Sequence, residues 1–269
     1  MAEYLGELGR LVRLRCASTE RAGRAARYRE RTTVEGLRRV QVIPAQARTW
    51  DVDWALADQA EVAALSQFVT GAWGSGPWHW VSVEASRWNL LTPDEADLVS
   101  HSVSGVTDVG PMLDVDGVWR ARSVGTTLTS GYAIVVAGIP VLPGVKVTWS
   151  ADVVGSVAAA PQIAMSFLDA SGKVVSGGYK SGLAMAGVQR VSQTLTPPAG
   201  AVSVAVGIAP SVLKMTRPQV SWTDGPVPFS AGHGCRAAVV EWGGSDLIAA
   251  WDERSGALSS TGFTVLEVM

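Results

Sequence analysis

The sequence contains little of what most catalytic, metal-binding or disulfide-bonded proteins need. It has only two cysteines, Cys16 and Cys235, and three histidines, His79, His101 and His233. Two cysteines cannot build a disulfide framework, so we expect two buried thiols, with a single bridge as the alternative. No histidine or cysteine spacing matches a zinc motif. We therefore expect no metal site and no cofactor.

Motifs of enzymes are missing as well. There is no Gly-x-Ser-x-Gly elbow, and no glycine-rich loop stands between a strand and a helix to hold phosphate. His233 and Cys235 lie two residues apart and could pair as base and nucleophile, but their glycine-rich surroundings favour a turn. We expect no catalytic residues, and we treat a hydrolase as the weakest hypothesis.

Two Asp-Val-Asp pairs are the only candidates for paired carboxylates or a calcium site. Asp51 and Asp53 fall within a strand pattern and are expected on its solvated face. Asp114 and Asp116 precede Gly117 in an expected loop, where a calcium ion is the alternative to solvated side chains.

Long hydrophobic runs and high charge are absent too. Hydrophobic residues make up 47% of the chain and charged residues 17%, as in a globular protein with a core. No apolar run is long enough to cross a bilayer, and the first ten residues do not read as a secretory signal. We expect synthesis in a cytoplasm and no membrane partner.

The net charge of −2 conceals an arginine-rich start, since residues 1–40 hold ten arginines against five acids. Nucleic-acid binding is one explanation, and a solvated loop or polar subunit contact is the other. Few aromatic residues interleave with these arginines, so we favour the second and expect no sequence-specific nucleic acid. Residues 18–33 are predicted to form a polar loop or arm, with Arg24 and Arg27 at a subunit contact.

Residues 139–223 are organised as short strands separated by Gly/Pro turns. From residue 145 apolar side chains alternate with Thr148, Ser150 and Asp152, which predicts a strand with one buried and one wet face. Residues 162–169 and 173–175 flank a polar turn and predict a hairpin. Further strands are expected at 189–195, 201–209 and 218–223. This pattern predicts an antiparallel sandwich or jelly roll.

The N-terminal part predicts another sheet with one helix. Trp50, Val52 and Trp54 share a face of an expected strand. Asp58 is placed to cap a helix over 58–70 with a Glu three residues on, followed by Gly71. Its apolar stripe comprises Val62, Leu65, Phe68 and Val69.

Six of the eleven tryptophans fall between positions 50 and 88. Tryptophan is abundant both in domain cores and in the centres of interfaces. We therefore keep two interpretations of Trp73, Trp78 and Trp80: packing in the core, or a buried contact between subunits.

The last 36 residues are too few for a domain, yet they contain strand patterns at 235–242, 247–252 and 262–268. They need a sheet to join, and the strands of residues 1–88 are available. The fold class is therefore mainly all-β. Residues 1–88 and 230–269 form one discontinuous domain, and 89–229 form an inserted sandwich.

The inserted segment resembles a known group of folds. The runs Val-Leu-Pro-Gly-Val-Lys-Val-Thr-Trp-Ser-Ala-Asp-Val, Phe-Leu-Asp-Ala-Ser-Gly-Lys-Val-Val and Pro-Pro-Ala-Gly-Ala-Val-Ser-Val-Ala-Val-Gly resemble the carbohydrate-binding-module-like jelly rolls of bacterial glycan-active and phage proteins. Such folds hold sugars on exposed aromatic rings. The candidates here are Trp119, Tyr132, Tyr179 and Lys180, with a purely structural role as the alternative.

The whole plan resembles the distal tail proteins and related minor tail proteins of tailed phages. The residues that carry this resemblance are Arg48-Thr-Trp-Asp-Val-Asp-Trp54, the helix after it, Gly74-Ser-Gly-Pro-Trp-His-Trp80, Asn89-Leu-Leu-Thr-Pro93 and Phe263-Thr-Val-Leu-Glu-Val268. The resemblance implies that an N-terminal β-sandwich with one helix forms a homo-oligomeric ring, usually a hexamer, at the virion tail tip. Its expected partners are the tail tube, the tip or hub proteins, the tape measure and a host cell-wall glycan. The alternative is a soluble, monomeric carbohydrate-binding accessory protein.

Overall fold

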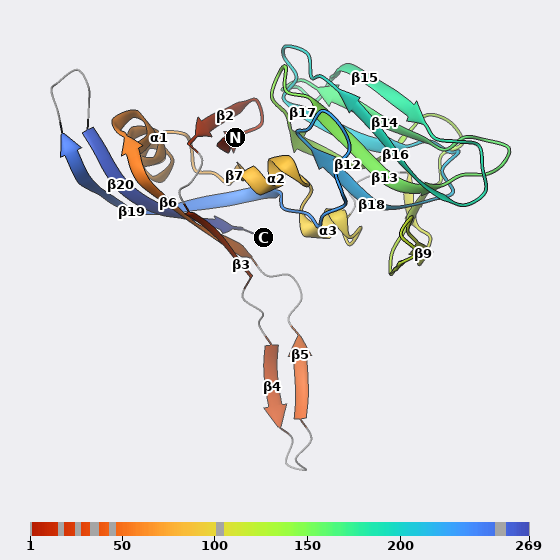
Figure 1. The fold of residues 1–269 in the computed structure, drawn as a ribbon, viewed down its shortest axis with the longest axis horizontal. Coiled ribbons are helices and arrows are strands. Elements are labelled where there is room, and N and C mark those ends of the chain that lie inside the picture. The colour runs from red at the N-terminus through yellow and green to blue at the C-terminus, as the bar shows by residue number, and fades with distance from the viewer. Residues whose placement is uncertain are drawn as a thin grey trace. The chain divides into compact units, whose positions relative to one another are not determined.

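The structure is a computed structural model of the chain, and it describes residues 2–15, 19–24, 28–32, 38–42, 47–100, 105–250 and 257–268 (Figure 1). The chain forms two compact units. The first comprises Met1–Leu5, Val12–Trp80 and Arg236–Met269, and the second comprises Gly6–Leu11 and Val81–Cys235. No helix among the described residues has the length and apolar content needed to cross a membrane.

The first unit is built on a seven-stranded sheet with the order β2-β1-β7-β19-β20-β6-β3. Its strands are β1 (Glu3–Glu7), β2 (Arg10–Leu14), β3 (Thr19–Arg24), β6 (Arg48–Asp58), β7 (Trp78–Val81), β19 (Cys235–Ala250) and β20 (Ala257–Glu267). The predicted strand at 235–242 and the described residues of the one predicted at 247–252 are parts of the single long strand β19. The remaining strands of this part, β4 (Tyr28–Thr32) and β5 (Arg38–Val42), pair only with each other among the described strands.

The C-terminal strands join the N-terminal sheet, as predicted. β20 runs antiparallel between β19 and β6 (Figure 1). A bidentate ion pair joins the strands from the two ends of the chain: Arg48 Nη2 lies 2.7 Å from Glu267 Oε1, and Arg48 Nε donates to Glu267 Oε2 at 2.9 Å. Because a bidentate guanidinium–carboxylate pair constrains both partners, it helps to hold β6 and β20 in register.

Helix α1 (Gln59–Val69) confirms the predicted capping box. Asp58 Oδ1 accepts from the Glu61 N–H at 2.8 Å, and Glu61 Oε2 accepts from the Asp58 N–H at 3.0 Å. The helix packs against β6 and β20 through Leu65 and Phe68. The predicted apolar stripe is wrong at its end, because Val69 is exposed.

The predicted loop over residues 18–33 is wrong in part. β3 extends the seven-stranded sheet by pairing with β6, and β4 begins a hairpin with β5. A polar composition does not distinguish a loop from these strands, because an edge strand and a two-stranded ribbon need few apolar residues. Cys16 and Arg27 lie outside the described residues, and so does the side chain of Arg24.

The second unit contains a β-sandwich. One sheet has the order β16-β13-β18-β11-β8, and the other has the order β12-β17-β14-β15. Their strands are β8 (Val106–Asp108), β11 (Val124–Thr126), β12 (Ala133–Pro140), β13 (Val147–Val154), β14 (Gln162–Leu168), β15 (Val174–Ser181), β16 (Val188–Leu195), β17 (Ser203–Ile208) and β18 (Lys214–Ser221). Two short helices, α2 (Val83–Arg87) and α3 (Pro93–Ala96), and a hairpin of β9 (Met112–Leu113) and β10 (Trp119–Arg120) complete the unit.

The predicted hairpin of this sandwich is confirmed. β14 and β15 pair antiparallel, and the Asp169 carboxylate accepts from the N–H groups of Ser171 and Lys173 in the turn. Gly172 has φ +80°, a left-handed conformation that glycine adopts without strain.

The predicted wet face of β13 is wrong. Thr148, Ser150 and Asp152 are buried, as are the apolar residues between them. β13 lies between β16 and β18, and both of its faces are covered. Its polar side chains can be buried because polar groups of other segments pair with them.

Candidate carbohydrate-binding site

Two of the predicted sugar-binding residues meet at one end of the four-stranded sheet. Tyr132 immediately precedes β12, and Tyr179 lies on β15, opposite Ala164 of β14. Their ring centroids are 6.3 Å apart and the ring planes differ by 26°. The Tyr132 hydroxyl donates to Gln162 Oε1 at 3.3 Å. We call these two rings the tyrosine pair.

The tyrosine pair presents a large exposed aromatic surface. Tyr179 is 63% exposed and Tyr132 is 37% exposed. Burial, and after it the neighbouring Tyr179, raises the pKa of the Tyr132 hydroxyl above its usual range. The hydroxyl therefore stays neutral at physiological pH and can both donate and accept hydrogen bonds.

A shallow hollow of about 420 Å³ adjoins Tyr132. Its lining is made of small and polar residues: Thr129, Ser130, Gly131, Tyr132, Ala159, Ala160, Gln162, Ala209, Pro210 and Ser211. The Ser211 hydroxyl is buried and has no hydrogen-bond partner among the described residues. Aromatic faces beside hydroxyl and amide groups suit a ligand that has both apolar faces and hydroxyls.

The other two sugar-binding candidates lie elsewhere. Lys180 follows Tyr179 on the same strand, and successive strand side chains point to opposite faces. The Lys180 side chain therefore points away from the tyrosine pair and is not part of the candidate site. Trp119 is on the β9–β10 hairpin and lines a separate hollow with residues of α3 and β18.

The tryptophans predicted at a subunit interface lie largely within the first unit. Trp80 and Trp78 are buried by the chain itself. Trp78 packs edge-on against Phe68 at 5.3 Å, and Trp73 stacks on the same ring at 5.4 Å. Core packing accounts for the burial of Trp78 and Trp80 without a neighbouring subunit.

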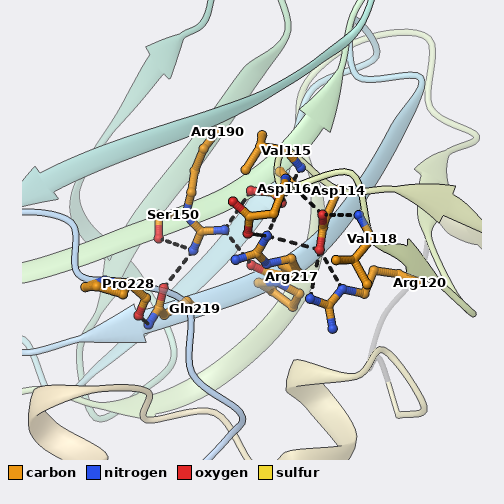
Figure 2. A network of polar contacts seen from close by, with 12 residues as sticks. Asp114, Val115, Asp116, Val118, Arg120, Ser150, Arg190, Arg217, Gln219 and Pro228 are labelled. Carbon is orange, nitrogen blue, oxygen red and sulfur yellow. Dashed lines mark hydrogen bonds and ion pairs between the residues drawn. The ribbon is translucent and has the colours of Figure 1, made fainter.

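Sequence reasoning missed a buried network of charges in the second unit (Figure 2). The turn of the β9–β10 hairpin supplies Asp114, whose Oδ2 lies 2.8 Å from Arg120 Nη2 and 3.1 Å from Arg217 Nη1. Arg217 also pairs with Asp116. The expectation of either solvated carboxylates or a calcium loop is therefore wrong for Asp114, because guanidinium groups occupy its Oδ2 and the Asp116 and Val118 N–H groups donate to its Oδ1.

Asp152 of β13 extends the network to Arg190 of the neighbouring strand β16. Its Oδ1 accepts from Arg190 Nη1 at 2.7 Å, and its Oδ2 lies 3.3 Å from Arg217 Nη1. Arg190 also donates to Ser150 Oγ and Gln219 Oε1 (Figure 2). Three arginines thus face three aspartates, so the charges of the network balance.

The network sets the protonation of its members. Burial alone would favour the neutral acid, but the Val118 N–H and the Arg120 and Arg217 guanidinium groups outweigh it and lower the pKa of Asp114. Burial lowers the pKa of the Arg190 guanidinium, and the bond to Asp152 offsets part of that effect. No sequence signal could have paired these residues, because they lie up to about a hundred positions apart.

The weak enzymatic candidates gain no supporting geometry. His233 Nε2 is 2.9 Å from Ser230 Oγ, and its Nδ1 is 3.5 Å from a Glu84 carboxylate oxygen. Cys235 is buried at the start of β19. Within the part of the chain that the structure describes, no cluster of three or more His, Cys, Asp or Glu residues is arranged to hold a metal ion. His101 lies outside that part.

The second unit is thus a β-sandwich that carries an exposed aromatic pair beside a polar hollow. Neither a protein-family model nor a curated protein matches the sequence. Among solved structures, the chain has a distant likeness to the enzymatically active domain of bacteriophage CBA120 tailspike protein 4. Identity is 12%, the TM-score is 0.38, and the match covers 50% of this chain and 21% of that one.

Two further likenesses are of the same kind. The CBM22-1–GH10 modules of Clostridium thermocellum xylanase 10B, complexed with xylohexaose, share 16% identity over 49% of this chain and 26% of that one, with a TM-score of 0.34. The accessory secretory protein 1, 2 and 3 structure of Streptococcus pneumoniae shares 12% identity over 45% and 87%, with a TM-score of 0.30. The chain spans only about a fifth and a quarter of the first two structures, and these values are too low to carry a functional argument.

Proposed function

We propose that the protein is a structural component of a phage tail tip, of the distal-tail type, whose second unit binds host glycan through the tyrosine pair. The observation that carries the glycan role is the pairing of Tyr132 and Tyr179 beside the polar hollow. Flat rings pack on the apolar face of a pyranose, while the Gln162 amide and the exposed hydroxyls of Thr129 and Ser130 supply hydrogen-bonding groups.

The architecture of the first unit supports the assembly role. Its sheet ends at β2 and β3, each of which has a neighbour on one side only among the described strands. Open strand edges are sites where another chain can add a strand, and a closed ring removes every such edge. Several copies of a weak glycan site on one ring would also raise the overall avidity.

Replacing Tyr179 with alanine is expected to weaken glycan binding by about tenfold, because the ring loses its contact area with the sugar. The measurement is a glycan array with the full chain, followed by calorimetry on the strongest ligand. Leu183→Ala is the matched control, since Leu183 is also exposed on the segment after β15. Equal binding by Tyr179→Ala and the unmodified chain would rule out the tyrosine pair.

The assembly role is tested by the mass of the protein in solution. Light scattering after size exclusion, together with negative-stain images, is expected to reveal a closed ring of several copies. A compact monomer that still binds glycan would instead support the alternative, a monomeric carbohydrate-binding protein acting through the second unit alone. The two measurements are independent, so either part of the proposal can fail without the other.

A further inference from the structure

A second hollow in the sandwich unit combines an exposed indole with polar groups that have no partner among the described residues. It encloses about 370 Å³ and is lined by Ala96, Asp97, Val99, Trp119, Arg120, Ala121, Arg122, Thr216, Arg217 and Phe229. Trp119 is 68% exposed, the most exposed of the aromatic side chains noted above. The indole lies on a short hairpin, contributes little to the core and presents a flat apolar face to solvent. We call this hollow the Trp119 site.

The wall of the Trp119 site is built, not incidental. Arg217 has φ +53°, a left-handed conformation that is costly for a residue with a side chain and concentrates at functional positions. Its side chain is 9% exposed, and its guanidinium lies 4.7 Å from the centre of the Phe229 ring. Within the described part of the chain its Nε has no hydrogen-bond partner. Arg217 is therefore a fixed, ion-paired part of this wall.

The rim of the Trp119 site offers one donor and one acceptor. Arg122 and Asp97 are both exposed, and among the described residues neither side chain forms an ion pair or a hydrogen bond. Asp97 follows α3 and Arg122 follows β10, so the two groups come from different segments. A carboxylate accepts from hydroxyls and a guanidinium donates to them, and such charge-assisted bonds are stronger than neutral ones.

The charges in and behind the Trp119 site sum to zero. The cations are Arg120, Arg122, Arg190 and Arg217, and the anions are Asp97, Asp114, Asp116 and Asp152. An anionic or cationic ligand would gain little from such a balanced field. A neutral ligand with one apolar face and several hydroxyls matches all the lining groups.

We propose that the Trp119 site binds an uncharged pyranose ring, separately from the tyrosine pair. The indole packs on the apolar face of the sugar, Asp97 accepts hydrogen bonds from its hydroxyls, and Arg122 donates to its oxygens. This inference rests on the proposed glycan-binding function and extends it, because two sites on one sandwich let a single polysaccharide or two strands of a cell wall be held at once.

The test uses the full chain labelled with 5-fluorotryptophan and followed by ¹⁹F NMR. The Trp119 resonance is identified by its disappearance in Trp119→Phe. The probes are methyl glucoside, methyl galactoside, methyl mannoside, N-acetylglucosamine and glucuronate. We expect the Trp119 resonance to shift saturably with at least one neutral sugar. Asp97→Asn and Arg122→Gln are each expected to weaken that binding about fivefold or more, while Tyr179→Ala leaves it unchanged.

Each outcome decides the proposal. If no neutral sugar shifts the Trp119 resonance, or if glucuronate binds tenfold tighter than methyl glucoside, the Trp119 site is not a site for a neutral sugar. If Asp97→Asn and Arg122→Gln leave the affinity unchanged, the rim groups have no role and the proposal fails. Loss of array binding in Tyr179→Ala with an unaffected Trp119 titration supports two separate sites. If the Trp119 resonance responds to a neutral sugar while Tyr179→Ala leaves array binding unchanged, the tyrosine pair is contradicted and this inference still stands.

Discussion

Asp152→Asn is expected to destabilise the second unit by about 3–5 kcal/mol. The Asp152 side chain is 0% exposed, and it is the counter-ion that Arg190 and Arg217 share. The substitution preserves the shape of the side chain but removes its charge, so the mostly buried Arg190 guanidinium loses its carboxylate partner and Arg217 keeps only Asp114 and Asp116. The measurement is the free energy of unfolding from denaturant titration at neutral pH.

Asp53→Asn is the matched control for this experiment. Asp53 also lies on a strand, β6, but its side chain is exposed. Exposed surface charges contribute little, so the control is expected to change stability by less than about 0.5 kcal/mol. A loss below about 1 kcal/mol in Asp152→Asn would mean that the buried network is not held by its charges.

Asn89→Ala is expected to cost about 3 kcal/mol or more, because four buried backbone groups would lose a partner at once. Asn89 is fully buried. Its Oδ1 accepts from the N–H groups of Leu91 and Val220, and its Nδ2 donates to the carbonyls of Pro218 and Ser230. One side chain thus joins the entry of the second unit, the strand β18 and the exit segment of the same unit.

The unfolding of Asn89→Ala is measured in the same way, with Gln67→Ala as control. Gln67 is an exposed amide on α1, and its loss is expected to change the free energy of unfolding by less than about 0.5 kcal/mol. Hydrogen exchange provides a second readout, since the Leu91 and Val220 amides should lose protection in Asn89→Ala. Unchanged protection at both amides would contradict the role assigned to Asn89.

Much of the fold could be predicted because its signals are local. The alternation of Trp50, Val52 and Trp54 with exposed aspartates gave β6 its faces, and the Asp58–Glu61 capping box placed the start of α1. The joining of the C-terminal strands to the first sheet also followed from a simple requirement, since an amphipathic strand pattern needs a partner. The first two of these inferences depend on residues within about ten positions of one another.

The errors arose where partners are far apart in the sequence. Polar residues on β13 pointed to a solvated face, whereas Asp152 is covered by arginines of β16 and β18. Sequence alone gave Tyr132 and Tyr179 as separate candidates, and only the pairing of β12 and β14 with β17 brings them together. Of the Trp119 site, the sequence predicted only the indole of Trp119. The rest could not be predicted, because its polar rim comes from the segment after α3 as well as from the hairpin.

The shared sheet of the two chain ends has a consequence for how the protein is made. As the nascent chain leaves the ribosome, the sandwich of the second unit is complete before β19 appears, and it can fold while synthesis continues. The first unit must wait, because β7 and β6 are separated in its sheet by β19 and β20, which are translated after the second unit. Until then β6 and β7 lack β20 and β19 as neighbours. Their unpaired edges are exposed to aggregation with other nascent chains during that interval.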